Sequence, residues 1–211
     1  MFQNRGHAGK LLSEKLRKLK IPKNAIIVAI PRGGVVVGDM VAKELGMPLS
    51  IVVVKKIGSP ENPELAIGAV APEHTIFWDE KLMKTLSITE EGKKELLQEK
   101  EQECDEREKL LNIAIPETEG KMIAVVDDGV ATGSTVIVAA LFLRKKGAEK
   151  IILAVPVIAK DTISRIKKYF DRIVYLEAPL HFYAVGEFYD EFPEIRDEHV
   201  LEILKPKSAF S

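Results

Sequence analysis

Five short runs of apolar, mostly β-branched residues recur along the chain and limit the folds open to it. They occupy residues 25–30, 49–54, 121–126, 151–157 and 173–176. Each run is continuously apolar rather than alternating, which is typical of strands covered on both faces, as in a parallel sheet. Segments with helical character lie between the runs. This alternation predicts an α/β protein with a doubly wound, mainly parallel five-stranded sheet.

Helix boundaries are indicated by glycines and capping residues. Helices are expected over residues 8–19, 36–45, 136–146 and 161–169. Gly46 and Gly147 follow two of these segments directly, at the position where a left-handed residue commonly ends a helix. Asp161 is the expected N-cap of the last segment. The first segment carries an apolar face and is expected to precede the sheet as an N-terminal helix.

Two segments depart from the strand-helix alternation. Residues 66–78 predict two short strands around a turn at Pro72. Residues 89–112 predict a highly charged helix, with Thr89 as its cap. A thin apolar seam runs along this helix: Leu96, Leu97, Leu110 and Leu111. The preferred interpretation is a solvated face, and a homodimer contact is the weaker alternative.

Composition limits the classes of function. The 211 residues suit one α/β domain, with a core over about 25–176, a helical insertion over about 79–112 and a small hood over about 177–200. The net charge of −1, with cations spread among acids, argues against a nucleic-acid partner. Cys104 is the only cysteine and is expected to be a half-buried helix residue. The longest apolar stretch is too short to span a membrane, so a cytoplasmic protein is expected.

Residues 126–135, Val-Asp-Asp-Gly-Val-Ala-Thr-Gly-Ser-Thr, carry the strongest chemical signal. Asp127 and Asp128 end the third apolar run, and a small, hydroxyl-rich turn precedes a helix. Backbone N–H groups, hydroxyls and the positive end of that helix together form an anion site suited to phosphate. The two acids would repel a phosphate, so they must serve vicinal hydroxyls, or Mg²⁺ held through water. A sugar phosphate supplies a phosphate for the turn and vicinal hydroxyls, or a bound Mg²⁺, for the acids.

This segment resembles the phosphoribosyl-pyrophosphate signature of type I phosphoribosyltransferases. The resemblance implies that Asp127 and Asp128 hold the ribose 2- and 3-hydroxyls. It also implies that a loop of Ala131, Thr132, Gly133, Ser134 and Thr135 wraps the 5-phosphate, with Gly129 as a further substrate-binding residue. The alternative is an ordinary strand-helix connection in which the acids belong to a helix N-terminal cap. That alternative accounts neither for the doubled acid nor for the three hydroxyls.

A second loop, Pro31-Arg32-Gly33-Gly34, follows the first apolar run. Two glycines let backbone amides turn toward an anion, and Arg32 can add a charge-assisted contact. The loop resembles the pyrophosphate loop of the same family, which often carries a non-proline cis peptide. By itself the composition is that of a common turn. Paired with the acidic loop at the carboxyl ends of strands, it becomes the expected partner site.

Lys55 and Lys56 follow the second apolar run and precede a Pro-rich segment. Family members have a mobile loop after this strand that closes over pyrophosphate and commonly brings in a cation, so either lysine is a candidate. A solvated lysine pair at a strand edge is an equal alternative. Glu64 is a weaker candidate for proton transfer, because a single Glu in such a loop is typical of a solvated turn.

Four aromatic residues lie close together near the C-terminus: Phe182, Tyr183, Phe188 and Tyr189. In the family a variable hood covers the nucleobase, and aromatic faces stack on its ring. Phe182 and Tyr183 are therefore expected to bind the base. The alternative is a small hydrophobic cluster under a C-terminal excursion. The chain shows no base-selective signature, so the acceptor stays open.

The resemblance implies Mg²⁺-dependent transfer of the 5-phosphoribosyl group from phosphoribosyl pyrophosphate to a nitrogen of an aromatic base. Asp127, Asp128 and Arg32 would carry the chemistry, with Mg²⁺ held near the acids through substrate and water rather than directly. A module that senses phosphoribosyl pyrophosphate without turning it over is the alternative. A different enzyme for nucleotides or sugar phosphates is a third hypothesis.

Overall fold

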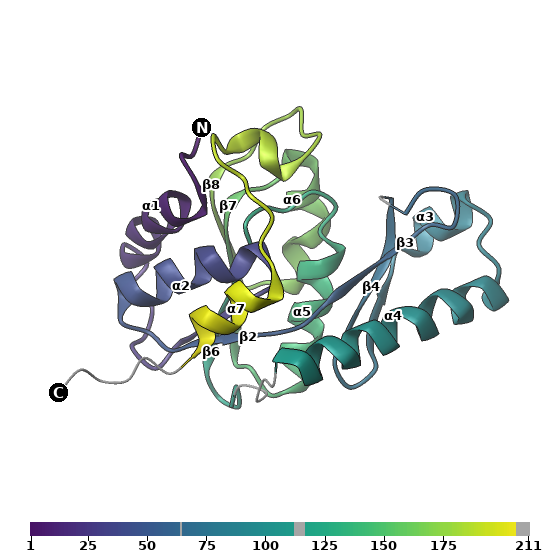
Figure 1. Ribbon diagram of the computed structural model, residues 1–211, viewed down its shortest axis with the longest axis horizontal. Coiled ribbons are helices and arrows are strands. Elements are labelled where there is room, and N and C mark those ends of the chain that lie inside the picture. Colours follow the sequence, from purple (N-terminus) through teal and green to yellow (C-terminus); the bar gives the residue numbers. More distant parts are fainter. Residues whose placement is uncertain (64, 112–116, 206–211) are drawn as a thin grey trace.

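The computed structural model describes residues 1–63, 65–111 and 117–205, and its centre is a parallel sheet (Figure 1). The strands of this sheet are β1 (Ile26–Ala29), β2 (Leu49–Ile51), β6 (Met122–Val126), β7 (Lys150–Val157) and β8 (Arg172–Glu177). They pair in the order β2-β1-β6-β7-β8, and every pair is parallel. The chain enters the sheet at β1, next to the edge strand β2, and later continues from β6 to the other edge at β8. The predicted doubly wound five-stranded sheet is therefore confirmed.

Helices cover both faces of the sheet, which explains why the strands are apolar throughout. Alternate strand residues such as Ile27 and Val126 pack with α1 (Arg5–Arg17) and α2 (Gly33–Leu45). The residues between them, such as Val28 and Val125, pack with α5 (Ser134–Lys145) and α6 (Lys160–Ile166). Each face thus buries its own set of side chains in a separate core.

The predicted helix ends are mostly correct. Gly46 is left-handed, with φ 63°, and closes α2, while Gly147 has φ 81° just beyond the end of α5. Asp161 is not the N-cap of α6, as the sequence predicted. That position belongs to Ala159, whose side chain makes no capping bond, and Asp161 lies in the first turn. A carboxylate there still interacts favourably with the helix dipole.

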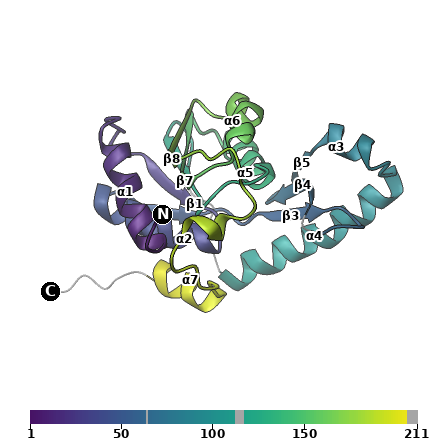
Figure 2. The same ribbon diagram turned by 90° about the horizontal axis from the view of Figure 1, so that it is seen from above.

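A lateral arm, residues 55–111, extends from the parallel sheet (Figures 1 and 2). It holds an antiparallel sheet, in the order β3-β4-β5, and two helices. Its elements are β3 (Lys55–Gly58), β4 (Ala66–Ala71), β5 (Thr75–Trp78), α3 (Glu80–Thr85) and α4 (Glu90–Leu111). The two strands predicted within 66–78 are confirmed. The placement of Lys55 and Lys56 at the end of a strand of the main sheet is wrong, because β2 ends at Ile51 and the lysines begin a new strand.

Helix α4 begins as predicted and is more than a solvated face. The amide of Gly92 donates to the hydroxyl of Thr89 at 3.1 Å, which confirms the cap. Cys104 and Leu111 are fully buried, whereas Leu110 is exposed. The prediction of a half-buried Cys104 is therefore wrong, because α4 packs along β3 and β4 and encloses this side chain. None of the helices in the described ranges is both long and apolar enough to cross a bilayer.

Cys104 is expected to be chemically inert in the folded protein. Burial raises the pKa of its thiol to about 12, and Sγ lies 3.7 Å from the carbonyl oxygen of Val53. Since the thiolate is the reactive form, an aromatic disulfide reagent at pH 8 should modify Cys104 only after denaturant is added. Rapid modification of the native protein would show that the arm opens readily.

The C-terminal segment returns across the top of the sheet. After β8 come a 3₁₀ turn, η2 (Val185–Phe188), and the last helix, α7 (Asp197–Leu204), which packs against α2 (Figure 2). Phe2 lies alongside this segment, since its amide donates to the carbonyl of Phe188 and its carbonyl accepts from the amide of Asp190, both at 2.8 Å. The N-terminal residues thereby hold the C-terminal segment over the carboxyl ends of the strands.

Candidate active site

The glycine loop, which is the segment Pro31-Arg32-Gly33-Gly34, is in direct contact with Asp127 and Asp128. β1 and β6 are neighbours, so the loops after them emerge side by side at the carboxyl edge of the sheet. A Cβ on Gly33 would lie 1.8 Å from Oδ2 of Asp128, and one on Gly34 would lie 2.8 Å from Oδ1 of Asp127. Only glycine fits such an approach. The peptide bond between Pro31 and Arg32 is cis, as the resemblance implied.

Asp128 is held by residues from both ends of the chain. Nε of Arg5, in the first turn of α1, donates to Oδ2 at 2.7 Å, and both side chains are largely buried. The hydroxyl of Tyr189 donates to the carbonyl of Asp128 at 2.6 Å. The ring of Phe192 lies 3.6 Å below the guanidinium of Arg5, in cation–π geometry. Asp128 therefore has a fixed orientation and a paired charge.

The surroundings of Asp127 disfavour a negative charge more strongly than those of Asp128. Its Oδ1 accepts from the amide of Asp128 at 2.8 Å. Burial raises the pKa of Asp127 well above its usual range, and the negative charge of Asp128 raises it further. Burial also raises the pKa of Asp128, but the adjacent Arg5 opposes that effect. Of the two acids, Asp127 is thus the one that takes up the first proton.

Residues 131–135, named the phosphate loop here after the ligand predicted for them, lead into α5, and their amides are unpaired in the described part of the chain. Gly133 is the N-cap, with φ 85°, and makes no side-chain capping bond. In the described part of the chain, the amides of residues 131–135 have no hydrogen-bond partner. The hydroxyl of Thr162 donates to the carbonyl of Ala131 at 2.5 Å and fixes the loop from α6. Unpaired amides at a helix N-terminus are suited to an anion.

A cavity of about 700 Å³ adjoins the phosphate loop. Its lining includes Lys56, Ala131, Thr132, Arg165, Phe182 and Tyr183. Phe182 packs on Phe188, with ring centroids 5.2 Å apart, while the side chain of Tyr183 is 83% exposed. The two aromatic residues predicted to bind a base thus line the same cavity as Ala131 and Thr132.

The side chains of the two lysines predicted for the site, Lys55 and Lys56, lie in different places. Lys56 lines the cavity, whereas Nζ of Lys55 pairs with Oε2 of Glu103 on α4 at 2.8 Å. The division follows from β3, since successive side chains in a strand point to opposite faces. Lys55 therefore serves the arm, and only Lys56 adjoins the site. Glu64 lies outside the described residues.

Arg32 lies under the C-terminal segment. Its guanidinium pairs with Oε1 of Glu194 at 3.2 Å, and Nη1 of Arg5 donates to the carbonyl of Pro193 at 2.8 Å. A hollow of about 380 Å³ lies between this segment and the glycine loop, lined by Arg5, Arg32, Gly33 and residues 192–195. Arg32 is thus near the acids, as predicted, and has an acidic neighbour that the sequence did not indicate.

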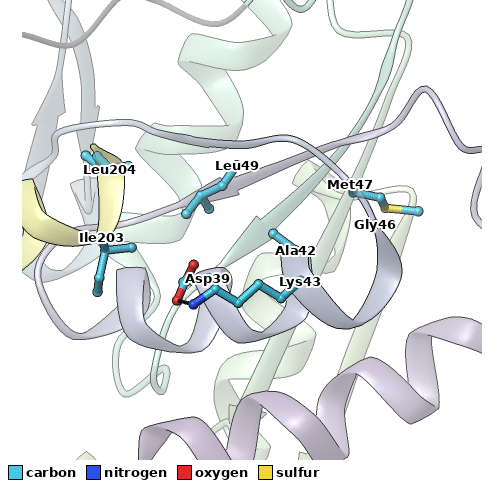
Figure 3. A pocket seen from close by; sticks show the side chains of 8 residues that line it. All are labelled: Asp39, Ala42, Lys43, Gly46, Met47, Leu49, Ile203 and Leu204. Atoms are coloured by element: carbon cyan, nitrogen blue, oxygen red, sulfur yellow. Dashed lines mark hydrogen bonds and ion pairs between the residues drawn. The ribbon is translucent and has the colours of Figure 1, made fainter. Parts of the chain in front are cut away.

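Another hollow, of about 360 Å³, lies between α2 and α7 (Figure 3). It is lined mainly by apolar side chains, among them Ala42, Met47 and Leu49, with an Asp39–Lys43 ion pair at its rim. Because it adjoins the C-terminal end of α2 and the start of β2, it lies at the opposite edge of the sheet from the acids. We assign it no catalytic part.

Comparison with known proteins agrees with this geometry. A family model described as the phosphoribosyl transferase domain matches residues 3–192. The chain belongs to the phosphoribosyltransferase family. Two sequences of Mycobacterium tuberculosis, strains H37Rv and CDC 1551, each named “Putative phosphoribosyl transferase”, are 35% identical to it over 209 residues, or 97% of this chain. The chain spans about half of those relatives, 46% of their length.

Solved structures show the same fold. TT1426 from Thermus thermophilus is 33% identical, with a TM-score of 0.81 over 96% of this chain and 97% of that one. AQ2163 from Aquifex aeolicus is only 12% identical, with a TM-score of 0.53 over 82% of this chain and 74% of that one, and shows likeness of fold alone. The type I phosphoribosyltransferase fold expected from the resemblance is confirmed.

Two residues of this candidate site had no sequence signal. Arg5 and Arg165 belong to no motif, and each reaches the site from a different helix. Tyr189 belongs to the aromatic cluster noted in the sequence, but its hydrogen bond to the carbonyl of Asp128 was not predicted. A buried acid pair does require a nearby cation, which was a general clue to a partner such as Arg5. The sequence offers 31 Lys and Arg residues and no local pattern to select among them.

Asp127→Asn is expected to stabilise the protein at neutral pH. A carboxyl with a raised folded-state pKa loses stability as pH rises from the unfolded value, about 4, through the folded one. Asn keeps the acceptor for the Asp128 amide and removes that loss. We expect a gain of about 1 kcal/mol, or roughly 2–4 °C in melting temperature. Melting curves of both proteins should converge near pH 4 and diverge toward pH 7; a pH-independent difference would contradict the assignment.

Proposed function

We propose that this chain catalyses transfer of the 5-phosphoribosyl group from phosphoribosyl pyrophosphate to a nitrogen of an aromatic base, with release of pyrophosphate. The observation that supports this most directly is the contact of Gly33 and Gly34 with Asp127 and Asp128, next to the open amides of the phosphate loop. A glycine loop, paired acids and a phosphate loop at one edge of the sheet match the three parts of this substrate: pyrophosphate, ribose and 5-phosphate.

Each group of site residues acts on a different part of the substrate in this reaction. The bond from C1 of ribose to pyrophosphate breaks, and a bond from C1 to the base nitrogen forms. Asp127 and Asp128 hold the ribose hydroxyls, and residues 131–135 hold the 5-phosphate, so the sugar is fixed while positive charge develops on it. Arg32 and the glycine-loop amides receive the charge of the leaving pyrophosphate. Phe182 and Tyr183 offer ring faces to the base.

Mg²⁺ fits this site as a partner of the substrate. No cluster of three His, Cys, Asp or Glu side chains able to hold a metal occurs within residues 1–63, 65–111 and 117–205. Oδ2 of Asp128 already accepts from Arg5, which leaves the second oxygen of that carboxylate for a hydrated ligand. When bound through substrate oxygens and water, Mg²⁺ would neutralise negative charge on the pyrophosphate.

The assay that tests this function measures pyrophosphate release. Purified protein with Mg²⁺ and phosphoribosyl pyrophosphate is challenged with purines, pyrimidines and pyridine carboxylates. Release that requires one of these bases supports the proposal and names the acceptor. Tight binding of phosphoribosyl pyrophosphate without release across the panel would favour the sensing module. Indifference to this ligand, with binding of other phosphates, would favour a different sugar-phosphate enzyme.

A further inference from the structure

Arg165 lies beside the phosphate loop although no motif includes it. It belongs to α6, and its Nη2 is 3.5 Å from Oγ of Ser134, the fully buried first residue of α5. Its side chain lines the 700 Å³ cavity together with Ala131 and Thr132. The guanidinium therefore borders the cavity at the place where the phosphate-loop amides are open.

Asp79 fixes the position of this guanidinium from the arm. Its Oδ1 accepts from the amide of Leu82 at 3.1 Å and so caps α3. Its Oδ2 forms an ion pair with Nη2 of Arg165 at 2.9 Å, and the carboxylate is largely buried. The two oxygens thus have separate partners, so Asp79 is oriented before any ligand arrives.

Electrostatics explains why an extra cation is useful here. The 5-phosphate must bind a few residues from two carboxylates, and loop amides supply only partial charges. Arg5 pairs with Asp128 and lines the hollow beside the glycine loop, whereas Arg165 lines the 700 Å³ cavity. At the cavity itself the charged side chains are Arg165, Lys56 and one acid, Asp161. A guanidinium, with its planar fork of donors, is well suited to a phosphate.

We propose that Arg165 is a direct ligand of the 5-phosphate and that Asp79 is its positioning residue. The inference rests on the proposed function and adds to it a binding group from outside the phosphate loop. It also gives the arm a part in the site, because the residue that orients Arg165 lies where β5 leads into α3.

Two ligands separate the two anion sites in a binding test. Ribose 5-phosphate reports on the phosphate loop, and inorganic pyrophosphate reports on the glycine loop; both are titrated calorimetrically. Arg165→Gln should weaken ribose 5-phosphate roughly ten-fold or more and leave pyrophosphate within two-fold. Arg165→Lys should restore part of the loss, since it keeps the charge without the fork. Equal affinity of wild type and Arg165→Gln for ribose 5-phosphate would overturn the proposal.

A matched control removes an ion pair of the same kind elsewhere. Arg107 pairs with Asp197 at 3.1 Å, and both side chains are about as exposed as those of Arg165 and Asp79. Arg107→Gln should leave the affinity for both ligands unchanged. If it weakened ribose 5-phosphate as much as Arg165→Gln does, the effect would be general destabilisation, and the proposal would fail.

Asp79→Asn tests the positioning part. Asn caps a helix as well as Asp does, so α3 and the melting temperature should change little. The charge that orients Arg165 is lost, and ribose 5-phosphate should bind about three-fold more weakly with pyrophosphate unaffected. No change would exclude Asp79 as the positioning residue. If wild-type protein bound neither ligand, the proposed function itself would fail, which is a separate outcome from that of the Arg165 variants.

Discussion

Asp128→Asn is expected to lower turnover at least ten-fold and to destabilise the protein by about 3 kcal/mol. The side chain of Arg5 is only 8% exposed, and Asp128 neutralises it at 2.7 Å. Asn has nearly the same shape but no charge, so it leaves a buried guanidinium without its counter-ion. The ribose hydroxyls also lose a charged acceptor. Pyrophosphate release and denaturant unfolding measure the two effects.

A double variant separates catalysis from stability. Arg5→Met together with Asp128→Asn removes both members of the buried pair, and it should recover much of the lost stability but none of the turnover. Normal kinetics in Asp128→Asn would contradict the assigned role of the acid. The comparison with Asp127→Asn is informative as well. The same chemical change in adjacent residues should have opposite effects on stability, since only Asp128 has a buried cation as partner.

Gly133→Ala is expected to abolish tight binding of phosphoribosyl pyrophosphate, with a loss of ten-fold or more in affinity. At φ 85° a side chain is strained, and the new Cβ would lie 2.6 Å from Cγ2 of Ile166 and 3.1 Å from Cγ2 of Thr162. Ile166 is fully buried and cannot move aside easily. The loop must shift instead, and its amides no longer converge on one phosphate. Calorimetric titration measures the affinity.

Gly120→Ala is the matched control for this variant. Gly120 also has a positive φ, 66°, but among the residues that the structure describes, chain neighbours aside, no atom lies within 4 Å of its added Cβ. It should cost about 1 kcal/mol of stability through backbone strain alone, with binding unchanged. If both variants bound phosphoribosyl pyrophosphate like the wild type, the loop around Gly133 would not be the phosphate site.

Much of the fold could be predicted because it depends on local patterns. The apolar run at 121–126 and the glycine after α2 each specify structure within a few residues, and both were placed correctly. The strand at Lys55 was missed because apolar residues continue through Val54, beyond the end of β2. Hydrophobicity alone does not show where a chain leaves one sheet for another.

The alternation of strands and helices, and the position of the two acids at a strand end, could be predicted from local sequence, since these features depend on neighbouring residues. The pairing of distant charges required the folded structure: Arg5 lies with Asp128, Arg165 lies with Asp79, and Lys56 rather than Lys55 lines the cavity. Arg5 and Asp128 are separated by 123 positions. The residues next to a charged side chain in the sequence do not identify its ion-pair partner, because the packing of whole helices and strands brings the two charges together.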